Sequence, residues 1–247
     1  MSTNPRPDER DQRPPDIHGP ATKDPGRNVG PSGQEEPTAR LLRLAATWNV
    51  TRPDVAERLA EREASAHRTR VETLRARWNA PRRHSEANPT REGPWGERLR
   101  QLEARLGRGV ILGLIGPRRV GKTQMAVELM KAVTDRGKSA LYRTATELMM
   151  LFKACYRPEA TEGELDVIRA HRKPALLIID EFARRAESEW ENNLLFELLN
   201  HRYGDMTDTI LACNLSQADL EACLGASLTS RLSEGGGVVQ CGWGHFR

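Results

Sequence analysis

Apolar runs and amphipathic stretches alternate along the chain from residue 110 onward. The runs 110–115, 139–144, 174–180 and 209–214 predict strands, and apolar residues recur at helical spacing in the segments between them. This alternation predicts an α/β domain with a mainly parallel sheet that is covered by helices on both faces. Such sheets bind ligands at the carboxyl ends of their strands, so the residues after each run are the first candidates for a functional site.

Two helical patterns precede the alternating region. The first begins near Pro53 and ends at Pro81, and the second is a narrow apolar stripe that requires a packing partner. Between them, three prolines and a glycine predict a linker over residues 81–94. The apolar positions are Val55, Leu59, Val71, Leu74 and Trp78 in the first pattern and Trp95, Leu99, Leu102 and Leu106 in the second, which stops at Gly107 and Gly109.

The first 40 residues differ in composition from the rest. They hold eight of the 15 prolines, and their only aliphatic residues larger than alanine are Met1, Ile17 and Val29. A segment of this kind buries too little apolar surface to offset its ordering entropy. We therefore expect residues 1–40 to form a disordered, Pro-rich tail.

Composition excludes several classes of protein. No window approaches 18 consecutive apolar residues and no basic start leads into an apolar run, so we expect a cytoplasmic protein without membrane contact. The four cysteines form no C-x-x-C pair and the six histidines do not cluster, which argues against a metal site built from side chains alone. The thiols are expected to be buried and reduced.

Positive charge is concentrated in the middle of the chain. Residues 41–109 carry fifteen basic residues, all arginines, against nine acidic ones, whereas the formal net charge of the whole chain is +4. Arginine suits forked contacts with phosphate or carboxylate. Both a solvated helical surface and a surface that binds nucleic acid or an acidic partner remain open.

A phosphate-binding motif follows the first strand run. The segment GPRRVGKT, residues 116–123, fits G-x-x-x-x-G-K-[ST] and precedes a helical pattern, as this motif requires. Backbone N–H groups of such a loop close around phosphate oxygens, Lys122 reaches the β and γ phosphates, and the Thr123 hydroxyl ligates Mg²⁺. The residues expected to bind the nucleotide are Gly116, Pro117, Arg118, Arg119, Val120, Gly121, Lys122, Thr123 and Gln124.

Two acidic residues end the apolar run in ALLIIDEF, residues 175–182. Asp180 is expected to hold the Mg²⁺ shell with Thr123, and Glu181 to orient or deprotonate the water that attacks the γ-phosphate. The alternative is an acidic N-cap for the next helix. Together with the phosphate loop, the acidic pair predicts a nucleotide hydrolase.

The ordered set of motifs resembles the AAA+ ATPases, and within them the helicase loaders of the DnaC type and the transposition helpers of the IstB type. The resemblance covers about residues 95–247 and implies ATP as the nucleotide, the AAA+ strand order and no separate C-terminal helical lid. It rests on GPRRVGKT, LLIIDEF, FELLNHRYGDMTDTILACNLS, LTSRLSEGG and the closing GWGHFR.

The resemblance also implies three further site residues. Asn214 corresponds to sensor 1, Arg231 to the arginine finger given to a neighbouring subunit, and Arg247 to the sensor 2 arginine. The Asn214 amide suits a contact with the attacking water or the γ-phosphate, but also with its own loop. Arg231 lies on an expected helix, where it serves either an interface or a plain surface.

The positions of four other basic residues in the sequence allow two interpretations. Arg118, Arg119, Arg184 and Arg185 either face nucleic acid in an assembly or lie in solvated loops. The segment 145–157 corresponds by position to the extra helix of initiators and loaders. Its Met149, Met150, Leu151 and Phe152 are expected to pack, whereas Lys153 and Arg157 could contact phosphates.

These observations predict a P-loop AAA+ domain at 95–247, preceded by a linker at 81–94 and a helical partner-binding region at 41–80. The leading hypothesis is a helicase loader in DNA replication that oligomerises on binding ATP and contacts the backbone of single-stranded DNA. A transposition helper that recruits a transposase is the alternative. A third reading is a nucleotide-gated adaptor, against which the intact Lys122, Asp180 and Glu181 argue.

Overall fold

The computed structural model describes residues 52–184, 188–244 and 246. Pro53–Arg247 forms one compact unit, which holds all of these residues except Arg52. The expected tail at 1–40 and the start of the expected helical region lie outside the described residues, as do Arg185 and Arg247.

The centre of this unit is a parallel sheet of five strands in the order β2-β3-β4-β1-β5. The four strands expected from the apolar runs are present, and the prediction of a parallel α/β sheet is confirmed. The fifth strand was not predicted, because it is short and its first residue is the last of three consecutive glycines. The strands are β1 (Ile111–Ile115), β2 (Ala140–Thr144), β3 (Leu176–Asp180), β4 (Asp208–Ala212) and β5 (Gly237–Gln240).

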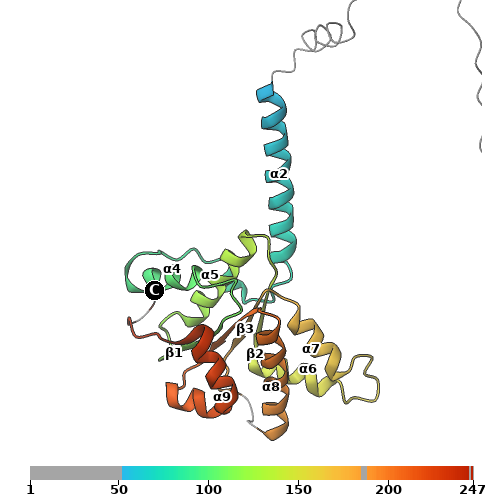
Figure 1. Ribbon diagram of the computed structural model, residues 1–247, viewed down its shortest axis with the longest axis vertical. Coiled ribbons are helices and arrows are strands. Elements are labelled where there is room, and N and C mark those ends of the chain that lie inside the picture. Colours follow the sequence, from blue (N-terminus) through green and yellow to red (C-terminus); the bar gives the residue numbers. More distant parts are fainter. Residues whose placement is uncertain (1–51, 185–187, 245, 247) are drawn as a thin grey trace, which may run out of the picture. The chain divides into compact units, whose positions relative to one another are not determined.

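Helices connect the strands (Figure 1). Three of the connecting helices begin at a hydroxyl N-cap: the side chains of Thr144, Ser188 and Ser216 each accept a backbone N–H from the first turn. The helices are α2 (Arg52–Arg75), α3 (Arg82–Ser85), α4 (Gly93–Glu103), α5 (Lys122–Asp135), α6 (Ala145–Ala154), α7 (Glu164–Arg172), α8 (Glu189–Gly204), α9 (Gln217–Arg231) and the π-helical turn η1 (Leu232–Gly236).

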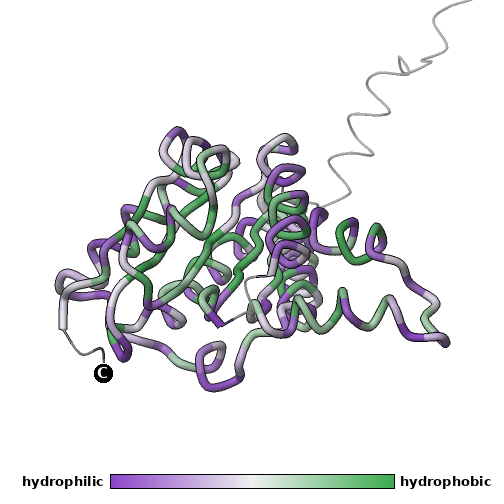
Figure 2. The backbone as a smooth tube through the Cα atoms, turned by 90° about the horizontal axis from the view of Figure 1, so that it is seen from below, coloured by the Kyte–Doolittle hydropathy of each residue, from purple (hydrophilic) through white to green (hydrophobic). Residues whose placement is uncertain are grey.

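Each strand sends alternate side chains into two separate cores, which makes the domain three-layered. In β1, Leu112 and Leu114 pack with α4 and α5, whereas Ile111 and Ile115 pack with α6, α7, α8 and α9. Because both faces are covered, β1, β3 and β4 are buried along their whole length. The hydrophobic stretches, green in Figure 2, accordingly gather in the interior.

The segment before the sheet packs on helix α5. Helix α2 ends at Arg75, earlier than the pattern up to Pro81 predicts, because Trp78 is a core residue of the sheet domain. The Trp78 indole Nε1 donates to the Thr134 hydroxyl over 3.0 Å. The backbone carbonyl of Trp78 accepts the N–H of Tyr142 over 2.7 Å.

Residues 81–94, expected to be a linker, also contact α5. The Lys131 ammonium donates to the carbonyl of Ala87 over 2.6 Å, and Arg91 pairs with the buried Glu128 over 3.2 Å. This segment therefore lies within the compact unit, and any role of residues 41–80 in binding a partner stays a prediction.

Two buried charged residues organise the amino ends of the strands. The Arg202 guanidinium donates to the Thr209 hydroxyl and to four backbone carbonyls, those of His171, Arg172, Pro174 and Asp208. The Asp208 carboxylate accepts three backbone N–H groups that lead into β1, those of Gly107, Gly109 and Val110.

The four cysteines are free thiols. Cys213 and Cys241 are buried, as expected, whereas Cys155 and Cys223 are only partly buried. Among the described residues, no helix combines the length and the apolarity needed to span a bilayer.

Candidate functional site

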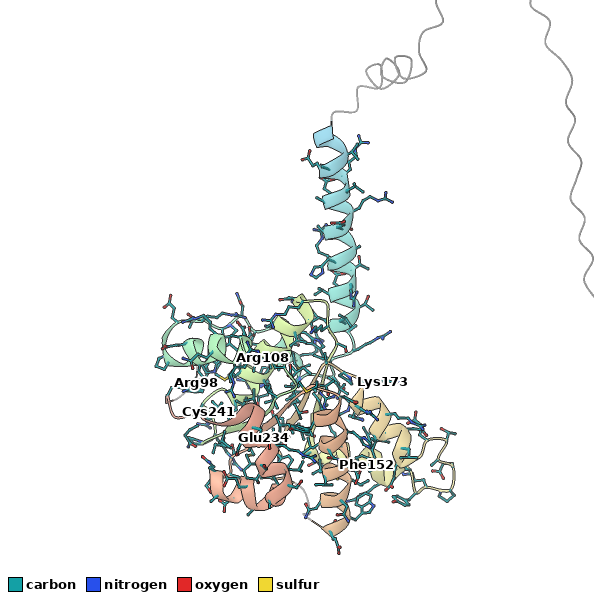
Figure 3. The ribbon with its side chains drawn as sticks, viewed as in Figure 1. Arg98, Arg108, Phe152, Lys173, Glu234 and Cys241 are labelled. Atoms are coloured by element: carbon teal, nitrogen blue, oxygen red, sulfur yellow. The ribbon has the colours of Figure 1, made fainter. Side chains whose placement is uncertain are left out.

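The phosphate loop lies between β1 and α5, at the carboxyl edge of the sheet. Gly116 adopts a positive φ of 139°, and a Cβ there would lie 2.5 Å from the carbonyl oxygen of Cys241. Cys241, labelled in Figure 3, follows β5, and its N–H donates to the carbonyl of Ile115 over 2.8 Å. The close passage of β5 therefore requires glycine at the first position of the loop.

Lys122 is the first residue of α5 and is 8% exposed. Its ammonium donates to the carbonyls of Gly116 and Pro117 over 2.8 and 2.7 Å and to Oδ1 of Asn214 over 2.7 Å. Burial lowers the pKa of Lys122, whereas Cys241 and Asp180 act in the opposite direction. The structure thus brings the expected lysine and the expected sensor amide into direct contact across 92 residues of sequence.

Thr123 and Asp180 also meet. The Thr123 hydroxyl donates to Oδ2 of Asp180 over 2.7 Å, and the Tyr142 hydroxyl donates to the same oxygen over 2.8 Å. Burial and the neighbouring carboxylate raise the pKa of Tyr142 well above its usual range, so this hydroxyl keeps its proton and remains a donor. The paired hydroxyl and carboxylate are the hard oxygen ligands that Mg²⁺ requires.

Glu181 leaves the line of the sheet directly after β3. Its φ of 52° lies in the left-handed region, and its N–H donates to Oδ1 of Asp180 over 2.7 Å. The next residue returns to the sheet, because the N–H of Phe182 donates to the carbonyl of Ala212 over 3.0 Å. The exposed Glu181 carboxylate pairs with Arg184, whose Nη1 lies 3.1 Å from both carboxylate oxygens.

The other residues expected to bind the nucleotide differ in exposure, and Val120 is buried. Pro117, Arg118 and Arg119 are exposed, and Arg119 adopts a φ of 68°. Gln124 faces away from the loop: its side chain donates to the carbonyl of His84 over 3.0 Å and to Glu128 over 3.1 Å. The Gln124 side chain therefore fastens His84 to α5, which leaves only the Gln124 backbone N–H for a role in nucleotide binding.

Arg231 lies apart from this cluster. It ends α9, which runs from the carboxyl end of β4 back toward the start of β5. Its guanidinium donates to Asn200 and lies 4.9 Å from the ring centre of Tyr203, both on the last turns of α8. Within one copy of the chain, Arg231 is therefore placed at the amino edge of the sheet, opposite the phosphate loop. Arg247 lies outside the described residues.

Four aromatic residues at the site were not predicted. Tyr142 contacts Asp180, and Trp95, Trp243 and Phe246 contact the phosphate loop from its outer side. The tyrosine at the centre of β2, the strand beside β3, was a possible signal, because a buried phenol requires a hydrogen-bond partner. Among the described residues, no cluster of three or more His, Cys, Asp and Glu offers a metal site of protein side chains alone.

Comparison with known families identifies the same region. The sequence model of the family "IstB-like ATP binding protein" matches residues 107–233, about half of the 247 residues. This match spans the phosphate loop, the acidic pair, Asn214 and Arg231.

Curated relatives come from two kinds of system. The replicative helicase loader DnaC of Escherichia coli K12 is 25% identical over 128 residues, 51% of this chain and 52% of the relative. An ATP-binding protein of an insertion sequence in Mycobacterium tuberculosis is 36% identical over 104 residues, 42% of this chain and 39% of the relative. The chain thus spans about half or less of the length of these two relatives.

A solved structure shares the fold. The crystal structure of the DnaC helicase loader superposes with a TM-score of 0.53 at 21% identity, over 66% of this chain and 97% of that chain. This likeness, with the strand order and the family match, confirms the AAA+ fold that the motifs predicted.

Proposed function

Because the chain belongs to the family of IstB-like ATP-binding proteins, we propose that it hydrolyses ATP and acts as the loader of a replicative helicase. One observation carries the ATPase assignment: residues far apart in sequence, Lys122 with Asn214 and Thr123 with Asp180, form direct hydrogen bonds at the carboxyl edge of the sheet. The helicase partner, the DNA and the assembly are proposed from the relatives and from the motifs.

Each residue has a role that follows from its chemistry. The loop amides and Lys122 bind the triphosphate, and Asn214, now bonded to Lys122, is placed to contact the γ-phosphate. Thr123 and Asp180 would hold Mg²⁺, which offsets the negative charge of the phosphate oxygens when bound with ATP. Tyr142 keeps Asp180 in place through its hydroxyl.

Glu181 is the residue proposed to orient the attacking water and accept its proton. Its left-handed backbone directs the carboxylate out of the strand, where it is exposed beside Asp180. The ion pair with Arg184 must loosen before the carboxylate can serve the water, so this arginine is placed to modulate turnover.

Arg231 is proposed to complete the site of a neighbouring copy. Its position at the amino edge of the sheet supports this role, because it is separated from the phosphate loop of its own chain by the length of the strands. Its contacts with Asn200 and Tyr203 must be exchanged for the phosphate on assembly. ATP binding would then link subunits, and hydrolysis would release them.

The biological role has two candidates. The match to DnaC supports helicase loading, with single-stranded DNA held through its backbone by basic residues. The family match and the 36% identity to the insertion-sequence protein favour a transposition helper as the second candidate, which would recruit a transposase instead.

The ATPase assignment is tested with full-length variants. Lys122→Ala should lose ATP binding, whereas the matched control Lys138→Ala, an exposed lysine, should retain it. Glu181→Gln should bind ATP but lose turnover. Unchanged ATP affinity in Lys122→Ala would contradict the phosphate-loop assignment, and unchanged turnover in Glu181→Gln would place the base elsewhere.

Mixing and capture experiments test the assembly and the partner. Arg231→Ala mixed with Glu181→Gln should recover turnover, since only a residue acting in trans can rescue the other subunit; failure of rescue indicates a role in cis. The full-length Glu181→Gln chain with ATP serves as bait for mass spectrometry. A hexameric helicase among the captured proteins supports the loader, and a transposase supports the second candidate.

A further inference from the structure

Three aromatic residues from opposite ends of the domain contact the phosphate loop. The Trp243 indole Nε1 donates to the carbonyl of Val120 over 2.8 Å, and the backbone N–H of Phe246 donates to the carbonyl of Arg119 over 2.9 Å. Trp95 Nε1, from α4, lies 3.4 Å from the carbonyl of Gly121. Three consecutive carbonyls of the loop thus accept hydrogen bonds from outside the site, and the Gly121 carbonyl also accepts the N–H of Met125 in α5 over 2.8 Å.

The three donors also fix the opposite side of the same peptide units. In a trans peptide, the carbonyl of one residue and the N–H of the next point in opposite directions. Holding the carbonyls of Arg119, Val120 and Gly121 therefore directs the N–H groups of Val120, Gly121 and Lys122 toward the other side of the loop. Successive N–H groups turned to one side form the concave cradle that binds phosphate oxygens.

The loop conformation that is held in this way carries strain. Arg119 has a φ of 68°, a left-handed conformation that is strained for a residue other than glycine. Such a conformation persists only where the surroundings fix it, and the hydrogen bond from Phe246 to the Arg119 carbonyl is one contact that does so. Without it, the loop is free to relax away from the anion-binding shape.

Packing connects the three aromatic residues into one unit. The rings of Phe246 and Trp95 lie 4.6 Å apart between their centres, with 40° between their planes. Phe246 also covers Gly121, where an added Cβ would lie 2.6 Å from the Phe246 ring. Trp95 is 5% exposed, so one side of this contact is anchored in the core of the sheet domain. Phe246 is thereby fixed against α4.

We propose that Trp95, Trp243 and Phe246, which we call the aromatic clamp, are positioning residues that hold the phosphate loop in its nucleotide-binding conformation. The inference rests on the proposed ATP site but adds residues that contact only the outer side of the loop. Its consequence is that ATP affinity depends on the segment after β5, which lies more than 120 residues from the loop.

The test separates nucleotide affinity from folding. Trp243→Phe removes the N–H donor and keeps an aromatic ring, and we expect ATP to bind about fivefold more weakly, the change typical of one lost hydrogen bond. Phe246→Ala should weaken binding more than tenfold, and Phe246→Tyr should restore it because the ring returns. Trp190→Phe is the matched control, since its indole Nε1 donates to Tyr156 instead of to the loop.

Two readouts distinguish positioning from general destabilisation. The urea midpoint without nucleotide should shift little in Trp243→Phe, while the dissociation constants of ATP and ADP rise together. Arg119→Gly accepts a positive φ without strain, so the loss caused by Trp243→Phe should shrink in that background. A merely structural role of Trp243 predicts a lower urea midpoint and no such rescue.

A separate experiment tests Arg247, because this residue directly follows Phe246 of the aromatic clamp in the sequence. In an Arg247→Ala background, Trp243→Phe should still weaken ATP binding about fivefold. Loss of the effect in this background would assign it to Arg247 and overturn the clamp.

The same variants test the proposed ATP site independently of the aromatic clamp. If Lys122→Ala loses ATP while Trp243→Phe and Phe246→Ala bind it as the unmodified chain does, the clamp is wrong and the ATP site stands. If Lys122→Ala retains ATP, the ATP site itself is wrong.

Discussion

The hydroxyl of Thr123 donates a 2.7 Å hydrogen bond to the carboxylate of Asp180, joining the phosphate loop to the end of β3. These residues lie 57 positions apart, and the parallel sheet brings them together because Asp180 ends β3 and Thr123 lies in the first turn of α5, at the same edge of the sheet. Tyr142 completes the arrangement from β2, since its hydroxyl donates to the same carboxylate oxygen.

Tyr142→Phe should lower the free energy of unfolding by about 1–3 kcal/mol, because a buried carboxylate loses one of its donors. The same change should raise the Mg²⁺ concentration needed for half-maximal ATP turnover several-fold, since Asp180 is held less firmly. Urea unfolding and a Mg²⁺ titration measure the two effects. Tyr156→Phe is the control, because the Tyr156 side chain is exposed and its hydroxyl bonds Glu164 instead. If neither the free energy of unfolding nor the required Mg²⁺ concentration changes in Tyr142→Phe, Tyr142 does not hold Asp180.

Arg184→Ala should raise ATP turnover without assembly by up to about fivefold. The gain corresponds to an exposed ion pair of about 0–1 kcal/mol that no longer competes for the Glu181 carboxylate. Steady-state phosphate release measures the rate. Arg169→Ala breaks an equally spaced and exposed pair with Asp166 and should leave turnover unchanged. A lower rate in Arg184→Ala would mean that this arginine assists catalysis.

Arg202→Met should destabilise the fold by about 3–5 kcal/mol, the range for removing one partner of a buried charged network. The change leaves the carbonyls at the end of α7 and the start of β4 without their donor. Burial lowers the pKa of Arg202 to about 10, so the guanidinium is charged at neutral pH. Urea unfolding measures the loss, and Arg202→Lys should recover only part of it, because an ammonium lacks the planar fork. Full recovery by lysine would contradict this account.

His171 should make the fold sensitive to acid. Burial lowers the pKa of His171, and the neighbouring Arg143 and Arg202 act in the same direction, so the folded state holds the neutral ring. The unfolded chain takes up a proton near pH 6.5, whereas the folded chain does so only at lower pH. Stability from this residue is therefore present above about pH 6.5 and is lost as the pH falls through the folded pKa, by at most about 1.4 kcal/mol per pH unit.

Urea midpoints at pH 7.5 and 5.5 check this expectation. His171→Gln should reduce the difference between the two midpoints, because glutamine does not titrate. The matched control is His67→Gln on the exposed surface of α2, which should keep the full difference. An equal acid sensitivity in both variants would assign the effect to other groups.

The sequence predicted the order of elements well but their ends less well. Three of the four expected strands, β1, β3 and β4, were marked by continuous apolar residues because they are buried on both faces, whereas the edge strand β2 is only partly buried. The short β5 carries only two valines after three glycines, so no local pattern marked it. Helix α2 stopped at Arg75 because Trp78 gains more by entering the core than by extending the helix, and helical spacing alone could not show this.

Local sequence by itself determined the phosphate loop and the acidic pair, since glycine spacing, a lysine and two carboxylates after an apolar run specify their chemistry without reference to distant residues. Only the tertiary structure decided that Tyr142 supports Asp180 and that Trp95, Trp243 and Phe246 hold the loop. The physical reason is that strand order and register set these contacts between distant parts of the chain, and no periodicity within a segment encodes them.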